Sequence, residues 1–171
     1  MTIDNESIFQ NDRTLHKIHH MYKNIIANLL HSRFEKKFKT TKTNVGNQIV
    51  KVDLMSEDKT IAVKIINSKL KMYDKINPST FQRILSATLV LSLVDSRRKL
   101  LIFTNKIMYE KFCSIFITMP YPVSHLREII EIVCVPLSDG LDDDVYCDGT
   151  EELQNFENCL NHLWTDWNEK N

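Results

Sequence analysis

The sequence predicts an α/β domain in which a small mixed β-sheet packs against helices. Segments with apolar residues at every third or fourth position, which indicate amphipathic helices, alternate with segments that have the two-residue period of strands. The chain has only three glycines and four prolines, too few for the many turns of a β-barrel. Its 171 residues suit one domain, so we expect a single domain over 1–171.

The first half of the chain predicts a helix, a β-hairpin and a second helix. Apolar side chains three and four apart predict the first helix, from about 14 to 38. The next segment, 41–48, is a loop or ragged edge strand. Alternating segments at 48–56 and 59–67 predict a hairpin around the polar turn SEDK. Asn77 followed by Pro78 marks the start of the second helix, because proline favours the first helical position.

The second half continues the alternation of strands and helices. The continuous apolar run KLLIFT is typical of a strand that is buried on both faces. The core is expected to span about 14–137, followed by an acidic loop over 138–149. The remaining expected elements are a helix at 106–117, a short helix at 124–130, a strand at 132–137 and a C-terminal helix at 150–167.

Charge is distributed unevenly although the net charge is zero. The span 33–75 holds eleven Lys/Arg and five Asp/Glu, whereas 128–171 holds twelve acids and one base. One interpretation is two solvated faces of opposite sign; the other is a nucleic-acid-facing basic side, with an acidic side that faces a protein. Three lysines of the basic span, Lys69, Lys71 and Lys75, are the candidates for weak, sequence-independent RNA contact.

Other features of the sequence exclude several classes of protein. No apolar run approaches 18 residues and the polar N-terminus lacks a signal peptide's regions, so no membrane segment is expected. The four cysteines lack CxxC spacing and are expected to be reduced thiols. Zinc-protease, P-loop, dinucleotide and esterase motifs are absent, and no small-molecule substrate is expected. The cluster His16, His19 and His20 is interpreted as surface residues or helix-end contacts.

The predicted hairpin, VDLMSEDKTIAVKI, carries the residues that are most informative about chemistry. Asp53 ends its first strand, and Ala62 and Lys64 share one face of its second, because residues two apart on a strand point the same way. In metal-dependent phosphodiester cleavage, carboxylates hold Mg²⁺ or Mn²⁺ while a lysine contacts the water or the phosphate. Asp53 and Lys64 fit this arrangement, but alanine stands at the place of the second acid.

The order helix, Asp/Lys hairpin, helix, strand resembles the core of the PD-(D/E)XK nuclease superfamily. The chain is more closely similar to the cap-snatching endonuclease domains at the N-terminus of orthomyxovirus polymerase PA subunits, above all those of the thogotovirus branch. The similarity includes the hairpin, the span from NPSTFQRI to YEKFCSIF and the ending LWTDWNE. It implies a PD-(D/E)XK nuclease-like fold, located in the host nucleus and cytoplasm, whose partners are the other viral polymerase subunits and RNA.

The resemblance also implies the roles of individual residues. Asp53 and Lys64 match the motif aspartate and lysine as a remnant catalytic pair, and Ala62 replaces the ligand glutamate. His31 is the best match for the histidine of the first helix. Glu35, four residues later, is a candidate substitute ligand. The expectation is therefore that His31, Asp53 and Glu35 bind Mn²⁺ or Mg²⁺ weakly or not at all, and that no cofactor is needed.

Three alternatives to a degenerate, structural nuclease domain stay open at this stage. The first is an active manganese- or magnesium-dependent endonuclease, in which Glu35 supplies a ligand or Ala62 is an engineered acid-to-alanine change. The second is an unrelated adaptor that binds a partner through its acidic C-terminal helix. The third is a hairpin without a special function, in which Lys64 is simply solvated.

Overall fold

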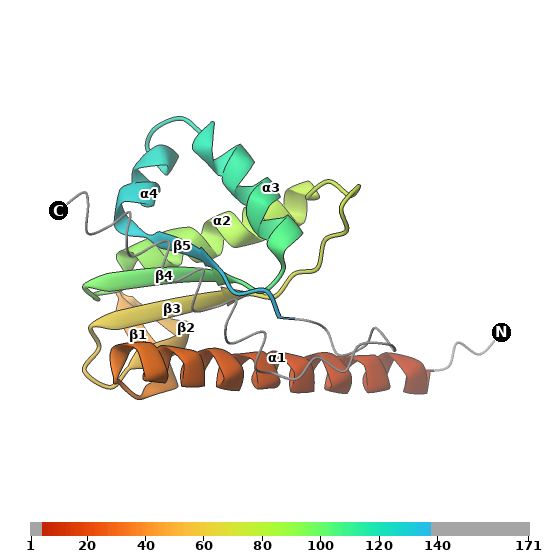
Figure 1. Ribbon diagram of the computed structural model, residues 1–171, viewed down its shortest axis with the longest axis horizontal. Helices are drawn as coiled ribbons and strands as arrows, with labels where there is room; N and C mark the ends of the chain where they lie inside the picture. Colours follow the sequence, from red (N-terminus) through yellow and green to blue (C-terminus); the bar gives the residue numbers. More distant parts are fainter. Residues whose placement is uncertain (1–4, 138–171) are drawn as a thin grey trace.

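The computed structural model describes the backbone of residues 5–137 and the side chains of residues 19–137. A five-stranded mixed sheet has a long helix, α1 (Asn5–Phe34), on one face, and α2 (Pro78–Leu93), α3 (Lys106–Ile117) and α4 (Leu126–Ile129) on the other (Figure 1). A short 3₁₀ turn, η1 (Val123–His125), precedes α4. The predicted α/β class with a small mixed sheet is confirmed.

The strands follow one another across the sheet in chain order, β1-β2-β3-β4-β5. The first three form an antiparallel meander, whereas β3, β4 and β5 are parallel to one another. Helices α2 and α3 make the crossovers that parallel strands require. The strands are β1 (Phe38–Val45), β2 (Gln48–Ser56), β3 (Ile61–Ile66), β4 (Arg98–Phe103) and β5 (Glu131–Cys134).

Side chains that alternate along β3 divide the core into two layers. Ile61, Val63 and Ile65 pack toward α1, whereas Ala62 and Ile66 pack toward α2 and α3. A strand buried on both faces needs apolar residues at nearly every position, and Lys64 is the exception in β3. The ammonium group of Lys64 therefore needs a polar or charged partner, and it has one in the carboxylate of Asp53.

Side-chain caps explain where α2 and α3 begin. The carboxamide oxygen of Asn77 accepts the backbone N–H of Thr80 at 2.7 Å, with Pro78 at the first position of the helix. Asn105 caps α3 in the same way, at 2.8 Å from the N–H of Met108. The Asn77 cap sets where α2 begins, and residues of α2 line the hollows described below.

Some boundaries differ from those expected. α1 starts at Asn5 rather than near 14, and it ends at Phe34 because Glu35 adopts a φ of 53°. An edge strand, one of the two forms expected for 41–48, spans residues 38–45. The expected acidic loop over 138–149 and helix over 150–167 lie outside the described residues. Among the residues that are described, no helix has the length and apolarity needed to cross a membrane.

The β2–β3 hairpin separates close to its turn. The two strands pair at Leu54 with Val63 and at Met55 with Ala62, and the pairing stops there. On the other side of β2, the register with β1 shifts between Lys39 and Thr41, so β2 carries a bulge at this level. Asp53 lies at the point where the strands separate, and its side chain occupies the space between them.

Candidate functional site

The carboxylate of Asp53 is the centre of a buried, fully paired cluster. Its Oδ1 lies 3.1 Å from the ammonium group of Lys23, and its Oδ2 lies 3.1 Å from that of Lys64. Oδ2 also accepts the backbone N–H of Ile65 at 3.0 Å. The Asp53 side chain thus replaces the main-chain hydrogen bond that Ile65 would have made to β2 in a regular ladder.

Lys23 reaches this cluster from α1. It occupies the same helical stripe as Ile26 and Leu30, which are three and seven residues further on and are buried against the sheet. Lys23 is itself buried, and a buried ammonium requires a counter-charge. The signal for this residue was present in the sequence: a lysine interrupts an otherwise apolar helical face.

The pKa of Asp53 is lowered by its surroundings. Burial acts in the opposite direction and raises it, but the N–H of Ile65 and the charges of Lys64 and Lys23 together outweigh burial. Asp53 is therefore ionised at neutral pH. Two ammonium groups share one carboxylate, so the cluster carries an excess of positive charge.

His19 lies one helical turn before Lys23 and lines the same cavity. Its Nδ1 accepts a hydrogen bond from the side-chain amide of Asn67, at 3.0 Å. Burial lowers the pKa of His19, and the nearby charge of Lys23 lowers it further, against the opposing effect of Asp53. The imidazole is thus neutral at physiological pH, as its acceptor role requires. We expected His19 at the surface or at a helix end, whereas in the structure it is half-buried and lines the cavity.

The structure does not bring His31 or Glu35 to Asp53. His31 is twelve residues after His19, which corresponds to about 18 Å along a helix. Its exposed ring lies 3.1 Å from the carbonyl oxygen of Lys36. Glu35 is exposed and follows the end of α1. Of the three proposed metal ligands, only Asp53 is located in the cavity.

Ala62 does not line the cavity. Its side chain is 0% exposed and packs in the apolar layer between the sheet and α2 and α3. Its neighbours across the two flanking strands are Met55 and Lys99. The position that would carry an acid in an active nuclease is here part of the hydrophobic core.

These donors do not fit Mg²⁺ or Mn²⁺. Both ions prefer several oxygen ligands, and the cavity offers one carboxylate whose two oxygens already bind ammonium groups. Within the described part of the chain, no group of three His, Cys, Asp or Glu side chains is arranged to hold a metal ion. The arrangement can neutralise and fix Asp53, and it presents cations to an anionic ligand.

The cavity beside Asp53 measures about 500 Å³ and lies between α1, the separated hairpin and α2. This volume is within the range of ~300–1,000 Å³ that is usual for ligand sites. Besides His19 and Asp53, its lining includes Lys51, Lys64 and Arg83, together with the apolar side chains Ile84, Ala87 and Val90 of α2.

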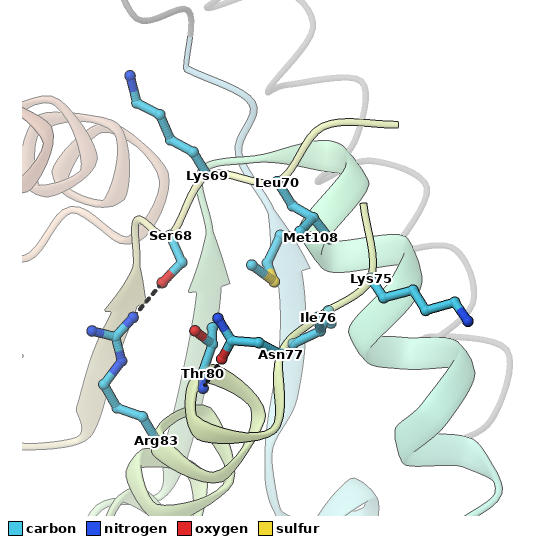
Figure 2. A pocket seen from close by; sticks show the side chains of 9 residues that line it. All are labelled: Ser68, Lys69, Leu70, Lys75, Ile76, Asn77, Thr80, Arg83 and Met108. Atoms are coloured by element: carbon cyan, nitrogen blue, oxygen red, sulfur yellow. Dashed lines mark hydrogen bonds between the residues drawn. The ribbon is translucent and has the colours of Figure 1, made fainter. Parts of the chain in front are cut away.

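A smaller hollow of about 280 Å³ lies between the 67–77 connection and the start of α2 (Figure 2). Lys69 and Lys75, two of the proposed RNA-contacting lysines, lie at its edge, whereas the third, Lys71, does not line it. The two hollows share Ser68 and Arg83, whose side chains form a hydrogen bond of 2.6 Å.

Comparisons with known proteins do not identify a relative. No family model matches the chain, and neither a curated protein nor a solved structure matches it. Its function therefore has to be inferred from the geometry of the site.

Proposed function

We propose that this chain is a nuclease-like domain without a catalytic metal, of the kind found at the N-terminus of viral polymerase PA subunits. In this role it shapes the path of RNA and contacts the other polymerase subunits, in the host nucleus and cytoplasm. The observation that supports the proposal is the state of Asp53. Both of its carboxylate oxygens are engaged, one by Lys23 and the other by Lys64 and the N–H of Ile65.

The charge balance of the cluster opposes catalysis by a metal. A divalent cation at Asp53 would have to displace two ammonium groups and would leave Lys23 buried without its counter-charge, which costs several kcal/mol. An active site of this class gathers carboxylates to offset the charge of the metal. This cluster gathers lysines around the one carboxylate instead.

The arrangement of the elements supports the nuclease-like part of the proposal. Helix α1, the meander β1–β3, helix α2 and the parallel strand β4 follow in the order that the resemblance implies. Asp53 and Lys64 belong to adjacent strands of the hairpin and their side chains meet. This order and this pair support a PD-(D/E)XK-like fold.

Calorimetric titration with Mn²⁺ tests the proposal. We expect no binding heat and no rise in the melting temperature of the full chain at 1 mM Mn²⁺. A ligand at a hundredfold excess over its Kd stabilises by about 2.7 kcal/mol, which raises the melting temperature of a domain of this size by roughly 5–10 °C.

Asp53→Asn provides the control for location. A rise in wild-type melting temperature that disappears in Asp53→Asn would place manganese at the site and contradict the proposal, in favour of an active endonuclease. A rise that persists in Asp53→Asn would indicate a metal elsewhere and leave the proposal standing. Incubation of the chain with single-stranded RNA and Mn²⁺ should yield no cleavage products.

A further inference from the structure

The two hollows lie side by side, and basic side chains line both of them. They adjoin at Ser68 and Arg83, which line both the larger hollow beside Asp53 and the smaller one at the start of α2. Five basic side chains line the pair: Lys51, Lys64, Lys69, Lys75 and Arg83. We call this surface the basic cradle. It draws on β2, β3, the 67–77 connection and α2, which are brought together only by the fold.

The cradle has almost no opposing negative charge. Asp53 is the one acidic residue in the described lining of either hollow, and two lysines already neutralise it. The basic span of the sequence, by contrast, contains five acids. The other four acids lie outside the cradle, whereas four lysines of this span, Lys51, Lys64, Lys69 and Lys75, line it.

The smaller hollow combines cations with an apolar floor. Figure 2 shows Arg83 and Ser68 directed toward each other at one side of the hollow, while Lys69 and Lys75 extend from its edge in different directions. The side chains of Leu70, Ile76 and Met108 also line it. Guanidinium, ammonium and hydroxyl groups suit phosphate oxygens, and apolar side chains suit a ribose or base.

We infer that the basic cradle binds the phosphate backbone of single-stranded RNA, with Arg83 at its centre. Cations that are spread over two adjoining hollows fit successive phosphates of a chain better than a single phosphate group. Arg83 borders both hollows, and its fork of donors can contact phosphate in either one. The choice of RNA rests on the proposed function, whereas the preference for a flexible polyanion rests on the cradle itself.

The cradle changes which residues are expected to matter. From the sequence, Lys69, Lys71 and Lys75 were the expected RNA contacts because they lie close together along the chain. The fold separates Lys71 from the hollows and adds Lys51, Lys64 and Arg83. Because Lys71 is an exposed cation of the same local segment, it serves as an internal control.

Two triple variants of the full chain separate the cradle from general charge. The test variant is Lys51→Gln, Lys69→Gln and Arg83→Gln. The matched control is Lys37→Gln, Lys71→Gln and Arg97→Gln, three exposed residues outside the cradle with the same loss of charge. Fluorescence anisotropy with a labelled twelve-nucleotide oligouridylate in 50 mM salt measures Kd for each protein.

We expect the test variant to weaken RNA binding by at least tenfold and the control variant by less than twofold. If the four cations that are not paired with Asp53 each neutralise one phosphate, the slope of log K against log salt is about −2.8 for the wild type and about −0.7 for the test variant. Equal losses in both variants, or no wild-type binding in 50 mM salt, would overturn the cradle.

The readout of this experiment is independent of the metal test. Absence of RNA binding by the wild type, together with no manganese binding, would remove the cradle and leave the non-catalytic assignment in place. Tight manganese binding together with the expected loss of affinity in the test variant would remove the non-catalytic assignment and keep the cradle.

Discussion

The ammonium group of Lys23 lies 3.1 Å from Oδ1 of Asp53, and the two side chains are only 10% and 6% exposed. This pair joins α1 to the sheet at the one level where the hairpin strands separate. Buried ion pairs stabilise a fold only when every polar atom is satisfied, and in the described residues no buried side-chain nitrogen or oxygen lacks a partner. The cluster therefore fixes the position of α1 against β2 and β3.

Lys23→Met is expected to destabilise the domain by about 2–4 kcal/mol, because Asp53 stays buried with one of its two ammonium partners gone. Lys64→Met is the matched control. The Lys64 side chain is 29% exposed, so water can replace part of its interaction and the expected cost is about 1 kcal/mol. Urea unfolding of both variants measures the difference. A larger cost for Lys64→Met would contradict the placement of Lys23 in the core.

Asp53→Asn should reduce both stability at pH 7 and its dependence on acid. The pKa of Asp53 is lowered in the folded state, so its stabilisation is present above the unfolded pKa of about 3.9 and is lost as pH falls through the folded value. The free-energy difference between wild type and variant is therefore expected to be about 3 kcal/mol at pH 7 and to shrink below about pH 4.

Thermal unfolding between pH 2.5 and 7 provides this comparison. The pKa of Asp58 is also lowered, first by its hydrogen bond with Lys36 and then by Ser56 and Thr60. Asp53→Asn should accordingly remove part of the acid sensitivity of the wild type rather than all of it. An unchanged pH dependence in the variant would mean that Asp53 is not ionised within the cluster.

His19 is expected to titrate below the usual imidazole value of about 6.5. Burial is the main cause, and the positive charges of Lys23, Lys64 and Lys51 add to it, while Asp53 opposes them. Because the pKa of His19 is lowered in the folded state, its contribution to stability is full above about pH 6.5. The contribution decreases as pH falls below 6.5 and through the folded value, because the unfolded state binds the proton at a higher pH than the folded state does.

Imidazole NMR titration of the wild type and of Lys51→Gln measures this pKa. We expect Lys51→Gln to raise the pKa of His19 because it removes one of the nearby positive charges. Arg97→Gln removes a charge outside the cavity and should leave the titration unchanged. A His19 pKa at or above 6.5 in the wild type would place the ring in solvent instead of beside Asn67.

The sequence predicted the α/β class, the hairpin and the helices after it, because periodicity and capping residues are local. It also paired Asp53 with Lys64, which strand alternation makes neighbours. It did not indicate which level of α1 faces Asp53, since an amphipathic stripe defines the buried face of a helix but not its position along its axis. In the structure, the part of α1 that faces Asp53 contains His19 and Lys23, whereas His31 lies further along the helix, away from the site.

Edge strands show a similar limit of local patterns. We expected the first helix to reach about 38 and the polar segment 41–48 to be a loop or ragged edge strand, whereas the structure has an edge strand, β1, over Phe38–Val45. This segment forms a strand because β2 offers it an unpaired edge. Pairing with a neighbour outweighed the weak pattern of the segment itself, as β propensity depends strongly on context.

Ala62→Glu distinguishes a core position from an empty ligand position. Ala62 is 0% exposed and packs with Met55, Ile84 and Leu101 in the apolar layer. A glutamate there would bury a carboxylate among apolar side chains, and we expect a loss of about 3–5 kcal/mol at pH 8. Ala62→Gln is the control for volume, because it adds the same number of heavy atoms without the charge.

The difference between these two variants should depend on pH and not on metal. A buried carboxyl has a raised pKa, so Ala62→Glu should approach the stability of Ala62→Gln as pH falls toward 5. Chemical denaturation at pH 5 and pH 8, with and without 1 mM Mn²⁺, measures both effects. If manganese restored the stability of Ala62→Glu at pH 8 and had no effect on Ala62→Gln, position 62 would be a ligand position beside Asp53. The lysine cluster would then have to give way to a metal once the second acid is supplied.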